Sequence, residues 1–275
     1  MGIVALSAGQ VHATNPSLAA VTVTTLARGP VKALPTGKFF VSNLEFRQLP
    51  GSDFGPHKHI AAIVYTLHGT STISIAGGAD QSVGAGEAAF IPAQVMHTHQ
   101  NLAGRIGAGA IAAGIIILAV LLCAATWLRG SRRRVTVAGL SVLLIGAGAL
   151  PLVGATSDDY YLLAVRPEAQ RVQPMPRPDG RVVFSSPVVD PVPTGPYVET
   201  LSAVSVAAGA RYDSPVTLGP QMIVILGGAA AVSVGDQTAQ LGTGDSTLAQ
   251  SGQALSILNS GTNTLQLLDF AVTSA

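Results

Sequence analysis

Short apolar or alternating runs, separated by Gly, Pro and Asp, follow one another through most of the chain. They lie at 39–46, 61–67, 71–78 and 87–92, and again at 199–206, 222–228, 230–236, 255–259 and 265–272. Alternation with a period of two, bounded by turn residues, is typical of β-strands, and many short strands in series indicate a barrel or a sandwich. We therefore expect an all-β structure on both sides of the chain's middle.

The middle of the chain breaks this pattern with two long apolar runs. Residues 107–128 form 22 positions, and residues 135–155 form 21 positions, without a charged side chain. Each run is long enough to cross about 30 Å of hydrocarbon as a helix, which takes roughly 20 residues. The pattern predicts a two-helix transmembrane hairpin over 105–156, with membrane lipid as a partner.

Four arginines lie between the two runs: Arg129, Arg132, Arg133 and Arg134. Short arginine-rich loops stay on the cytoplasmic side of a membrane. This predicts an integral membrane protein with a cytoplasmic Arg129–Arg134 loop and extracytoplasmic flanking domains. Residues 1–13 are a poor export signal because they lack a basic region, so an upstream start and an inverted topology both stay open.

The composition points in the same direction. Charged residues make up 11% of the 275 residues, whereas soluble domains carry about a quarter. The formal net charge of +1 lacks the excess of positive charge that is typical of nucleic-acid-binding proteins, so we expect no nucleic-acid partner. The single cysteine, Cys123, excludes an intrachain disulfide framework and a cysteine-based zinc site.

An internal repeat relates the two strand-rich parts. A shift of 158 residues superposes 51–101 on 209–259 without a gap, and six residues are then identical. Five of them are glycines, which suit turns with positive φ. The identical pairs are Gly51/Gly209, Gly69/Gly227, Gly77/Gly235, Gly84/Gly242, Gly86/Gly244 and Asn101/Asn259. We infer a duplication in which the hairpin interrupts the first copy, whose last strand follows at 160–165.

These boundaries predict the following organisation. An N-terminal segment with a poor signal-like start covers 1–37, and a first barrel covers 38–101 and 158–166. The hairpin lies between these two parts of the first barrel. A linker follows at 167–196, where eight of the 17 prolines make an extended connection. A second barrel covers 197–275.

Four of the six histidines form two pairs, His57 with His59 and His97 with His99. Residues i and i+2 of a strand point to the same face, so His57 and His59 can present two imidazoles side by side. A third imidazole from a neighbouring strand would complete a face of three nitrogens with open positions. A catalytic or substrate-binding transition metal needs such a face.

Both histidine motifs resemble those of the cupin superfamily. Residues 51–59 (GSDFGPHKH) fit the first family motif, and residues 86–101 (GEAAFIPAQVMHTHQN) fit the second except that Gln94 replaces a glycine. The resemblance covers 38–101 strongly and 197–272 weakly. It implies a bicupin with two cupin-type β-barrels (double-stranded β-helix), in which His57, His59 and His97 bind a metal.

One departure from the family pattern concerns the ligand set. The usual glutamate ligand is missing, because Ile63 and Val64 stand at its positions. Three histidines remain, as in cupins that resemble thiol dioxygenases. His99 lies two residues past His97 and stays open as a fourth ligand or a proton shuttle.

A second departure concerns the second copy, which is predicted to be degenerate and metal-free. The three histidine positions of the first copy are replaced there by Pro215, Thr217 and Leu255. Metal binding does not establish catalysis, because no general base stands out among the Ala, Ile, Val and Thr of the pocket strands.

The metal is expected to be a divalent transition ion, with Fe, Mn, Zn, Ni and Cu all open. Three functions stay open beside it. The first is a metal-dependent, dioxygenase-like oxidoreductase, and the second is a small-molecule-binding module. The third is a non-catalytic accessory or structural subunit of a larger membrane complex. A small-molecule ligand accompanies the first two, and membrane-protein partners or a homo-oligomer accompany the third.

Overall fold

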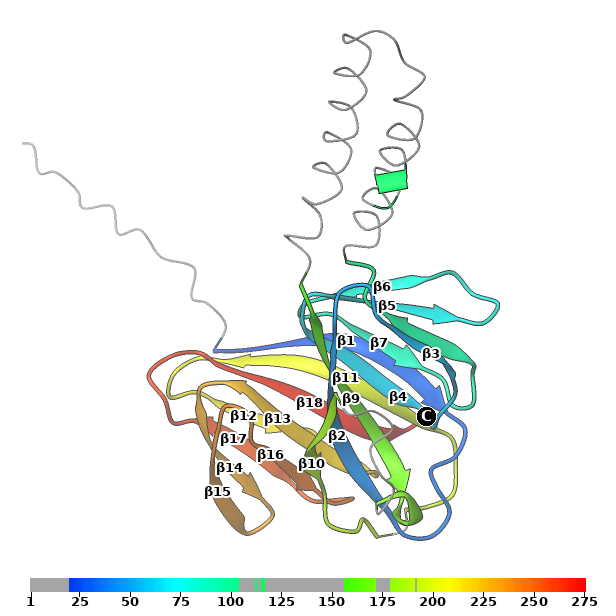
Figure 1. Ribbon diagram of the computed structural model, residues 1–275. Coiled ribbons are helices and arrows are strands. Elements are labelled where there is room, and N and C mark those ends of the chain that lie inside the picture. Colours follow the sequence, from blue (N-terminus) through cyan, green and yellow to red (C-terminus); the bar gives the residue numbers. More distant parts are fainter. Residues whose placement is uncertain (1–19, 104–111, 113–114, 117–155, 172–178, 191) are drawn as a thin grey trace, which may run out of the picture.

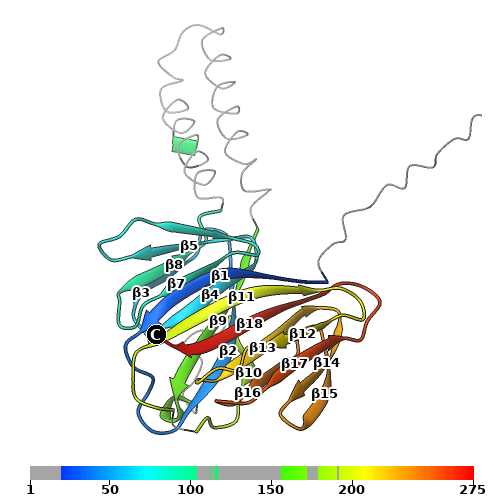
Figure 2. The same cartoon turned by 180° about the vertical axis from the view of Figure 1, so that it is seen from behind.

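The computed structural model describes residues 20–103, 112, 115–116, 156–171, 179–190 and 192–275. They form four antiparallel β-sheets, of which two have five strands and two have four. The two five-stranded sheets lie face to face, and each is covered on its outer side by one four-stranded sheet (Figures 1 and 2). The result is a stack of four layers with an apolar cluster in each of the three spaces between them.

The first half of the molecule consists of one sheet of each size. Its five-stranded sheet has the order β10-β2-β9-β4-β7, and its four-stranded sheet has the order β3-β8-β5-β6. The strands are β2 (Phe39–Gln48), β3 (Asp53–His57), β4 (Ala62–His68), β5 (Thr70–Ile75), β6 (Gln81–Gly84), β7 (Ala88–Ile91), β8 (His97–Gln100), β9 (Asp158–Pro167) and β10 (Gly180–Ser185). A 3₁₀ turn, η1 (Glu168–Gln170), follows β9.

The second half repeats this arrangement. Its five-stranded sheet has the order β1-β11-β18-β13-β16, and its four-stranded sheet has the order β12-β17-β14-β15. The strands are β1 (Val21–Val31), β11 (Tyr197–Val206), β12 (Arg211–Ser214), β13 (Gln221–Gly227), β14 (Ala229–Val234), β15 (Gln237–Gly242), β16 (Ser246–Ala249), β17 (Leu255–Asn259) and β18 (Leu265–Ser274).

Matching hydrogen bonds support the duplication inferred from the sequence. The backbone nitrogen of Gly51 donates to the carbonyl of Asn101 (2.9 Å), and that of Gly209 donates to the carbonyl of Asn259 (3.1 Å). Both asparagines are buried, and each side-chain amide donates to backbone carbonyls that it brings together. The two asparagines therefore hold equivalent strand connections closed in the two halves.

The constant shift of 158 residues does not hold at Gly69. Gly69 and Gly228 both have positive φ, at 75° and 101°, and each lies directly before a strand of the outer sheet. Gly228, rather than Gly227, is thus the structural counterpart of Gly69. A difference of one residue between the two copies, invisible to an ungapped comparison, explains the offset.

Two edge strands come from segments predicted to lie outside both barrels. β1 belongs to the N-terminal segment and pairs with β11 of the second half, while β10 belongs to the linker and pairs with β2 of the first half. Pro30 lies in β1, where an edge strand tolerates the missing backbone donor. Each large sheet therefore ends in a strand contributed from outside its own repeat.

The predicted transmembrane hairpin and the integral membrane localisation are corrected by this structure. The described part of the chain is all-β, and none of its helical residues belongs to a helix that is long and apolar enough to cross a membrane. Most of the two apolar runs, 107–111, 113–114, 117–128 and 135–155, lies outside the described residues. The prediction rested on the length of those runs, and length shows only that a helix would fit the hydrocarbon.

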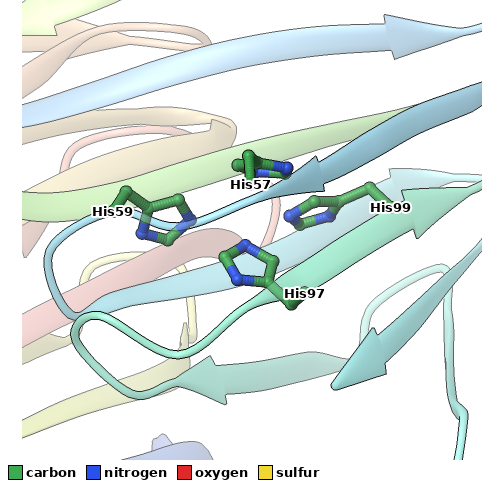
Figure 3. Close-up of side chains that lie close together, drawn as sticks. All are labelled: His57, His59, His97 and His99. Carbon is green, nitrogen blue, oxygen red and sulfur yellow. The ribbon is translucent and has the colours of Figure 1, made fainter. Parts of the chain in front are cut away.

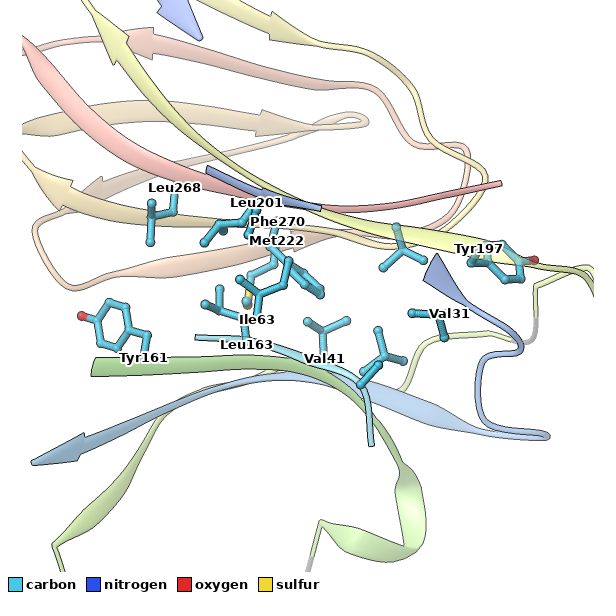
Figure 4. Packing of buried hydrophobic residues seen from close by; sticks show 14 of the residues in the cluster. Val31, Val41, Ile63, Tyr161, Leu163, Tyr197, Leu201, Met222, Leu268 and Phe270 are labelled. Carbon is cyan, nitrogen blue, oxygen red and sulfur yellow. The ribbon is translucent and has the colours of Figure 1, made fainter. Parts of the chain in front are cut away.

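The core between the two five-stranded sheets explains why several strands read as continuous apolar runs. Alternate residues of β4 and β13 face this central cluster, and those between them face the interior of their own half. Strands buried on both faces have no polar side, so 61–65 and 222–226 lack period-two alternation. The central cluster contains Val41, Ile63, Leu163, Leu201, Met222 and Phe270 (Figure 4).

Candidate metal centre

Four histidines of the first half converge on one point (Figure 3). His57 is the last residue of β3 and pairs directly with His97, the first residue of β8. His99 follows two residues later on the same face of β8, and both β8 histidines are buried. His59 lies past the end of β3, in the connection to β4, so it reaches the cluster from a loop rather than from the strand expected for it.

The imidazole rings are close enough for one ion to contact all of them. His97 is central, with ring centroids 4.4 Å from His57, 4.5 Å from His59 and 5.2 Å from His99. One nitrogen from each of the four side chains lies within 4.8 Å of the others. The structure thus brings together the three predicted ligands and adds His99, which the sequence had left open.

Backbone carbonyls set the protonation of three of these rings. Nδ1 of His57 donates to the carbonyl of Gly55 (2.9 Å), and Nδ1 of His97 donates to that of Val95 (2.9 Å). His59 makes the same bond to the carbonyl of Ile60. A carbonyl oxygen only accepts, so Nδ1 carries the proton and Nε2 keeps a free lone pair. Such bonds orient metal-binding histidines and fix their tautomer.

Burial favours the neutral form of three of the imidazoles. It lowers the pKa of His59 to about 4, with a smaller contribution from the charges of His97, His57 and Arg166. Burial likewise lowers the pKa of His97, and it lowers that of His99 well below its usual value. Metal ligation requires deprotonated nitrogens, and at neutral pH these rings supply them without releasing a proton.

The orphaned nitrogens show that the cluster fits a metal ion. Within the described part of the chain, Nε2 of His59, Nε2 of His97 and Nδ1 of His99 are buried and have no hydrogen-bond partner. Buried polar atoms without a partner are rare in proteins and usually mark an ion, a water or a functional site. Imidazole donors suit Zn, Cu, Fe and Ni. No carboxylate of the described residues joins the cluster, in keeping with the missing glutamate.

A pocket of about 430 Å³ opens beside the cluster. It lies between the inner face of the five-stranded sheet and the β3–β4 connection, and aromatic and aliphatic side chains make most of its wall. The lining residues are Ser42, Leu44, Phe46, Phe54, His57, Lys58, His59, Ile60, Ala62, Gln94, His99, Tyr160, Leu162, Ala164, Arg166 and Gln170. Volumes of this size are ordinary for small-molecule sites.

Gln94 shows why the second motif ordinarily has a glycine. It is the only non-glycine of the described residues with positive φ, at 60°, and its counterpart Gly252 has φ of 75°. Its backbone nitrogen donates to the carbonyl of His59 (2.7 Å). The strained turn therefore holds the loop that carries one of the four histidines.

The second half has a different set of side chains at the equivalent place. Ser214 pairs with Leu255 as His57 pairs with His97, so Ser214, not Pro215, occupies the position of His57. A β-bulge between Phe54 and His57 accounts for this one-residue difference. Ser214 belongs to a buried hydrogen-bonded group around Asp269, described below.

Both halves are built on one plan. In each, a four-stranded sheet packs on a five-stranded sheet. Each of the two motif segments contains one strand of the smaller sheet, and these two strands pair with each other. The fold is cupin-like. It carries the four-histidine cluster in its first half and the Asp269 group in its second half.

No protein-family model matches the chain, and no curated protein matches it. Among solved structures, AerE from Microcystis aeruginosa is 12% identical with a TM-score of 0.49, over 91% of this chain and 99% of AerE. Oxalate decarboxylase from Bacillus subtilis, studied for its Mn(II) centres, is 12% identical with a TM-score of 0.48, over 89% of this chain and 78% of its own. These are similarities of overall shape and assign no activity to the cupin-like chain.

Several residues of the pocket escaped the sequence-based prediction. Tyr160, Leu162, Ala164 and Arg166 alternate along β9 and face the pocket together. Their spacing is visible in the sequence, but the strand begins 59 residues beyond His99. Only the placement of β9 between β2 and β4 shows that this face meets the histidines.

Proposed function

We propose that the first half of the protein binds a divalent transition metal through His57, His59, His97 and His99 and uses it on a small molecule held in the adjoining pocket. The supporting observation is the convergence of four imidazoles, three of which have a buried nitrogen without a hydrogen-bond partner. A bound ion would supply a Lewis-acidic centre at the inner end of the pocket. The metal stays open among Fe, Mn, Zn, Ni and Cu.

The chain's own residues would prepare this chemistry. The carbonyls behind His57, His59 and His97 hold the rings, and the apolar wall of the pocket excludes water from the inner end. Low polarity around the site strengthens every electrostatic contact made inside it. As an enzyme, the protein would be a metal-dependent oxidoreductase with dioxygen as co-reactant.

A second candidate is metal-dependent binding without turnover. None of the described lining residues is Asp or Glu, so the pocket has no carboxylate to act as general acid or base. The cluster would then hold a ligand or a metal for another protein to use.

Metal content tests the proposal directly. Elemental analysis of the purified full chain should find one divalent transition ion per molecule, and a His57→Ala/His97→Ala variant should lose it. His68→Ala is the matched control, because His68 is exposed and its Nδ1 bonds to the carbonyl of Leu67, away from the cluster. Equal metal in wild type and the double variant would overturn the proposal.

Catalysis is tested separately with an oxygen electrode on the metal-loaded protein. Consumption of dioxygen with candidate thiols, phenolics or carboxylic acids, abolished in the His57→Ala/His97→Ala variant, supports the enzyme. A stable metal site with no consumption for any of them supports binding without turnover.

A further inference from the structure

The pocket beside the histidine cluster has cations on its wall and no acid. Arg166 and Lys58 line it, and none of the lining residues that the structure describes is Asp or Glu. The nearby Glu168 of η1 is already engaged, because Arg171 donates to both of its carboxylate oxygens (2.6 and 2.9 Å). A local excess of positive charge therefore faces the pocket.

Arg166 is part of the pocket wall rather than a free surface side chain. It lies opposite Phe40 in the β2–β9 ladder, with its guanidinium carbon 5.5 Å from the centroid of that ring. Its Nε donates to Oε1 of Gln170 (3.3 Å), which fixes one edge of the guanidinium. Burial lowers the pKa of Arg166, and its charge contributes to the lowered pKa of His59, so the two groups share one environment.

Ser42 is the second polar group at this end of the pocket. It is 1% exposed, and its Oγ has no hydrogen-bond partner among the described residues. Ser42 pairs with Ala164, two residues before Arg166 on the same face of β9, so Ser42 and Arg166 are diagonal neighbours across the two strands. A buried hydroxyl left without a partner is unfavourable unless a ligand supplies one.

We propose that the pocket binds small carboxylic acids with an apolar body, and that Arg166 and Ser42 together bind the carboxylate. A guanidinium matches a carboxylate with two parallel hydrogen bonds, and the hydroxyl adds a third donor. Leu44, Phe46 and Leu162 offer the apolar body its surface. Carboxylic acids would then be the substrate class of the proposed metal site. The inference depends on the proposed function only for the role of the metal.

Benzoate and benzamide form a matched pair of probes, because they differ little in shape but only benzoate is charged. Calorimetric titration of the full chain should show benzoate binding at least tenfold more tightly than benzamide. The difference should persist after chelator treatment, because neither Arg166 nor Ser42 is among the proposed metal ligands. Arg166→Gln should weaken benzoate binding at least tenfold and leave benzamide unchanged, and Ser42→Ala should weaken benzoate binding several-fold.

Arg211→Gln is the control, since Arg211 is an exposed cation of β12 in the other half. It should leave benzoate binding unchanged. Equal affinity for the two probes, no benzoate binding at millimolar concentration, or wild-type affinity in Arg166→Gln would overturn the inference. If Arg166→Gln fails to fold, Ser42→Ala and Arg166→Lys decide in its place. Benzoate discrimination by a protein that takes up no divalent ion when the ions are supplied would leave this inference standing and overturn the metal proposal alone.

Discussion

The ring of His99 lies almost parallel to that of Tyr160, with 6° between their planes and 5.3 Å between their centroids. Tyr160 in turn stacks on Phe46 at 5.5 Å. The imidazole is therefore held in one orientation, and its Nδ1 is buried beside the other three histidines. Preorganised rings of this kind favour metal binding, because less side-chain freedom is lost when the ion enters.

We expect His97 and His99 to differ in their contribution to metal affinity. His97→Ala removes the central ring of the cluster and should weaken binding by at least about a hundredfold, more than is usual for loss of a supporting group. His99→Ala should weaken it by roughly tenfold to a hundredfold, because the central ring of His97 and its two nearest neighbours remain. Competition titration against a chromogenic chelator measures both, with His68→Ala as the control. Wild-type affinity in His99→Ala would remove His99 from the ligand set.

Glu199 should make the free energy of unfolding fall as the pH rises. Burial raises its pKa to about 8 in the folded protein, from 4.5 in the unfolded chain. The folded state therefore holds the proton more tightly, and stability is lost between about pH 4.5 and pH 8, by up to about 1.4 kcal/mol per pH unit. Glu199→Gln should be more stable than wild type at pH 8. Urea unfolding across this pH range measures the difference.

The low end of the pH range serves as the control for Glu199. Near pH 4, most Glu199 carboxyls are protonated in both states, so wild type and Glu199→Gln should have similar stabilities. Curves that stay parallel from pH 4 to pH 8 would contradict the raised pKa of Glu199.

Gly29 allows β1 to lie directly on the first half. A Cβ at this position would lie 2.0 Å from Cδ1 of Phe90 in β7, a distance no real contact allows. Gly29→Ala should therefore destabilise the protein by about 1–3 kcal/mol through overpacking, although alanine is otherwise less unfavourable than glycine in a strand. Phe90→Leu in the same chain should recover part of this loss. Thermal unfolding checks both variants.

Gly227→Ala is the matched control for Gly29. It also lies in a strand, but a Cβ there meets nothing within 4 Å. The change should leave the stability within about 0.5 kcal/mol of wild type. An equal loss in both variants would show that the close approach to Phe90 does not cause the effect.

The second half should depend on Asp269 for stability rather than for metal binding. Asp269 accepts hydrogen bonds from Tyr212 (2.8 Å), Ser214 (3.1 Å) and Gln221 (2.7 Å), all buried. Asp269→Ala removes the acceptor that these three buried donors share and should cost about 3 kcal/mol of unfolding free energy. Urea unfolding measures the loss, and metal content should not change.

Asp213 provides the control for this prediction. It lies in β12 between two members of the group, but its side chain is exposed. Asp213→Ala should change the stability by less than about 0.5 kcal/mol. Loss of metal in Asp269→Ala without loss of stability would show that the second half contributes to the metal site.

The local pattern was sufficient for most strands and misleading for the chain's middle. Strands such as β2 and β18 could be predicted from their own residues. In them, apolar residues, including aromatic and β-branched ones, alternate with polar residues or follow one another between turn residues. The two apolar runs gave an equally strong signal for a membrane hairpin, which the described structure does not bear out. Hydropathy shows only that a segment could be buried in an apolar environment. It constrains the structure of that segment less than packing against the rest of the fold does.

The sequence by itself determined the duplication, the strand-rich halves and the three motif histidines, because each depends on spacing within a short stretch. Only the tertiary structure decided that His99 joins the cluster, that Ser214 replaces His57 in the second half, and that β9 brings Tyr160 and Arg166 to the pocket. These relationships depend on strand pairing and bulges between segments far apart in the chain. A one-residue difference in register changes which side chain faces a site, and no local pattern contains that information.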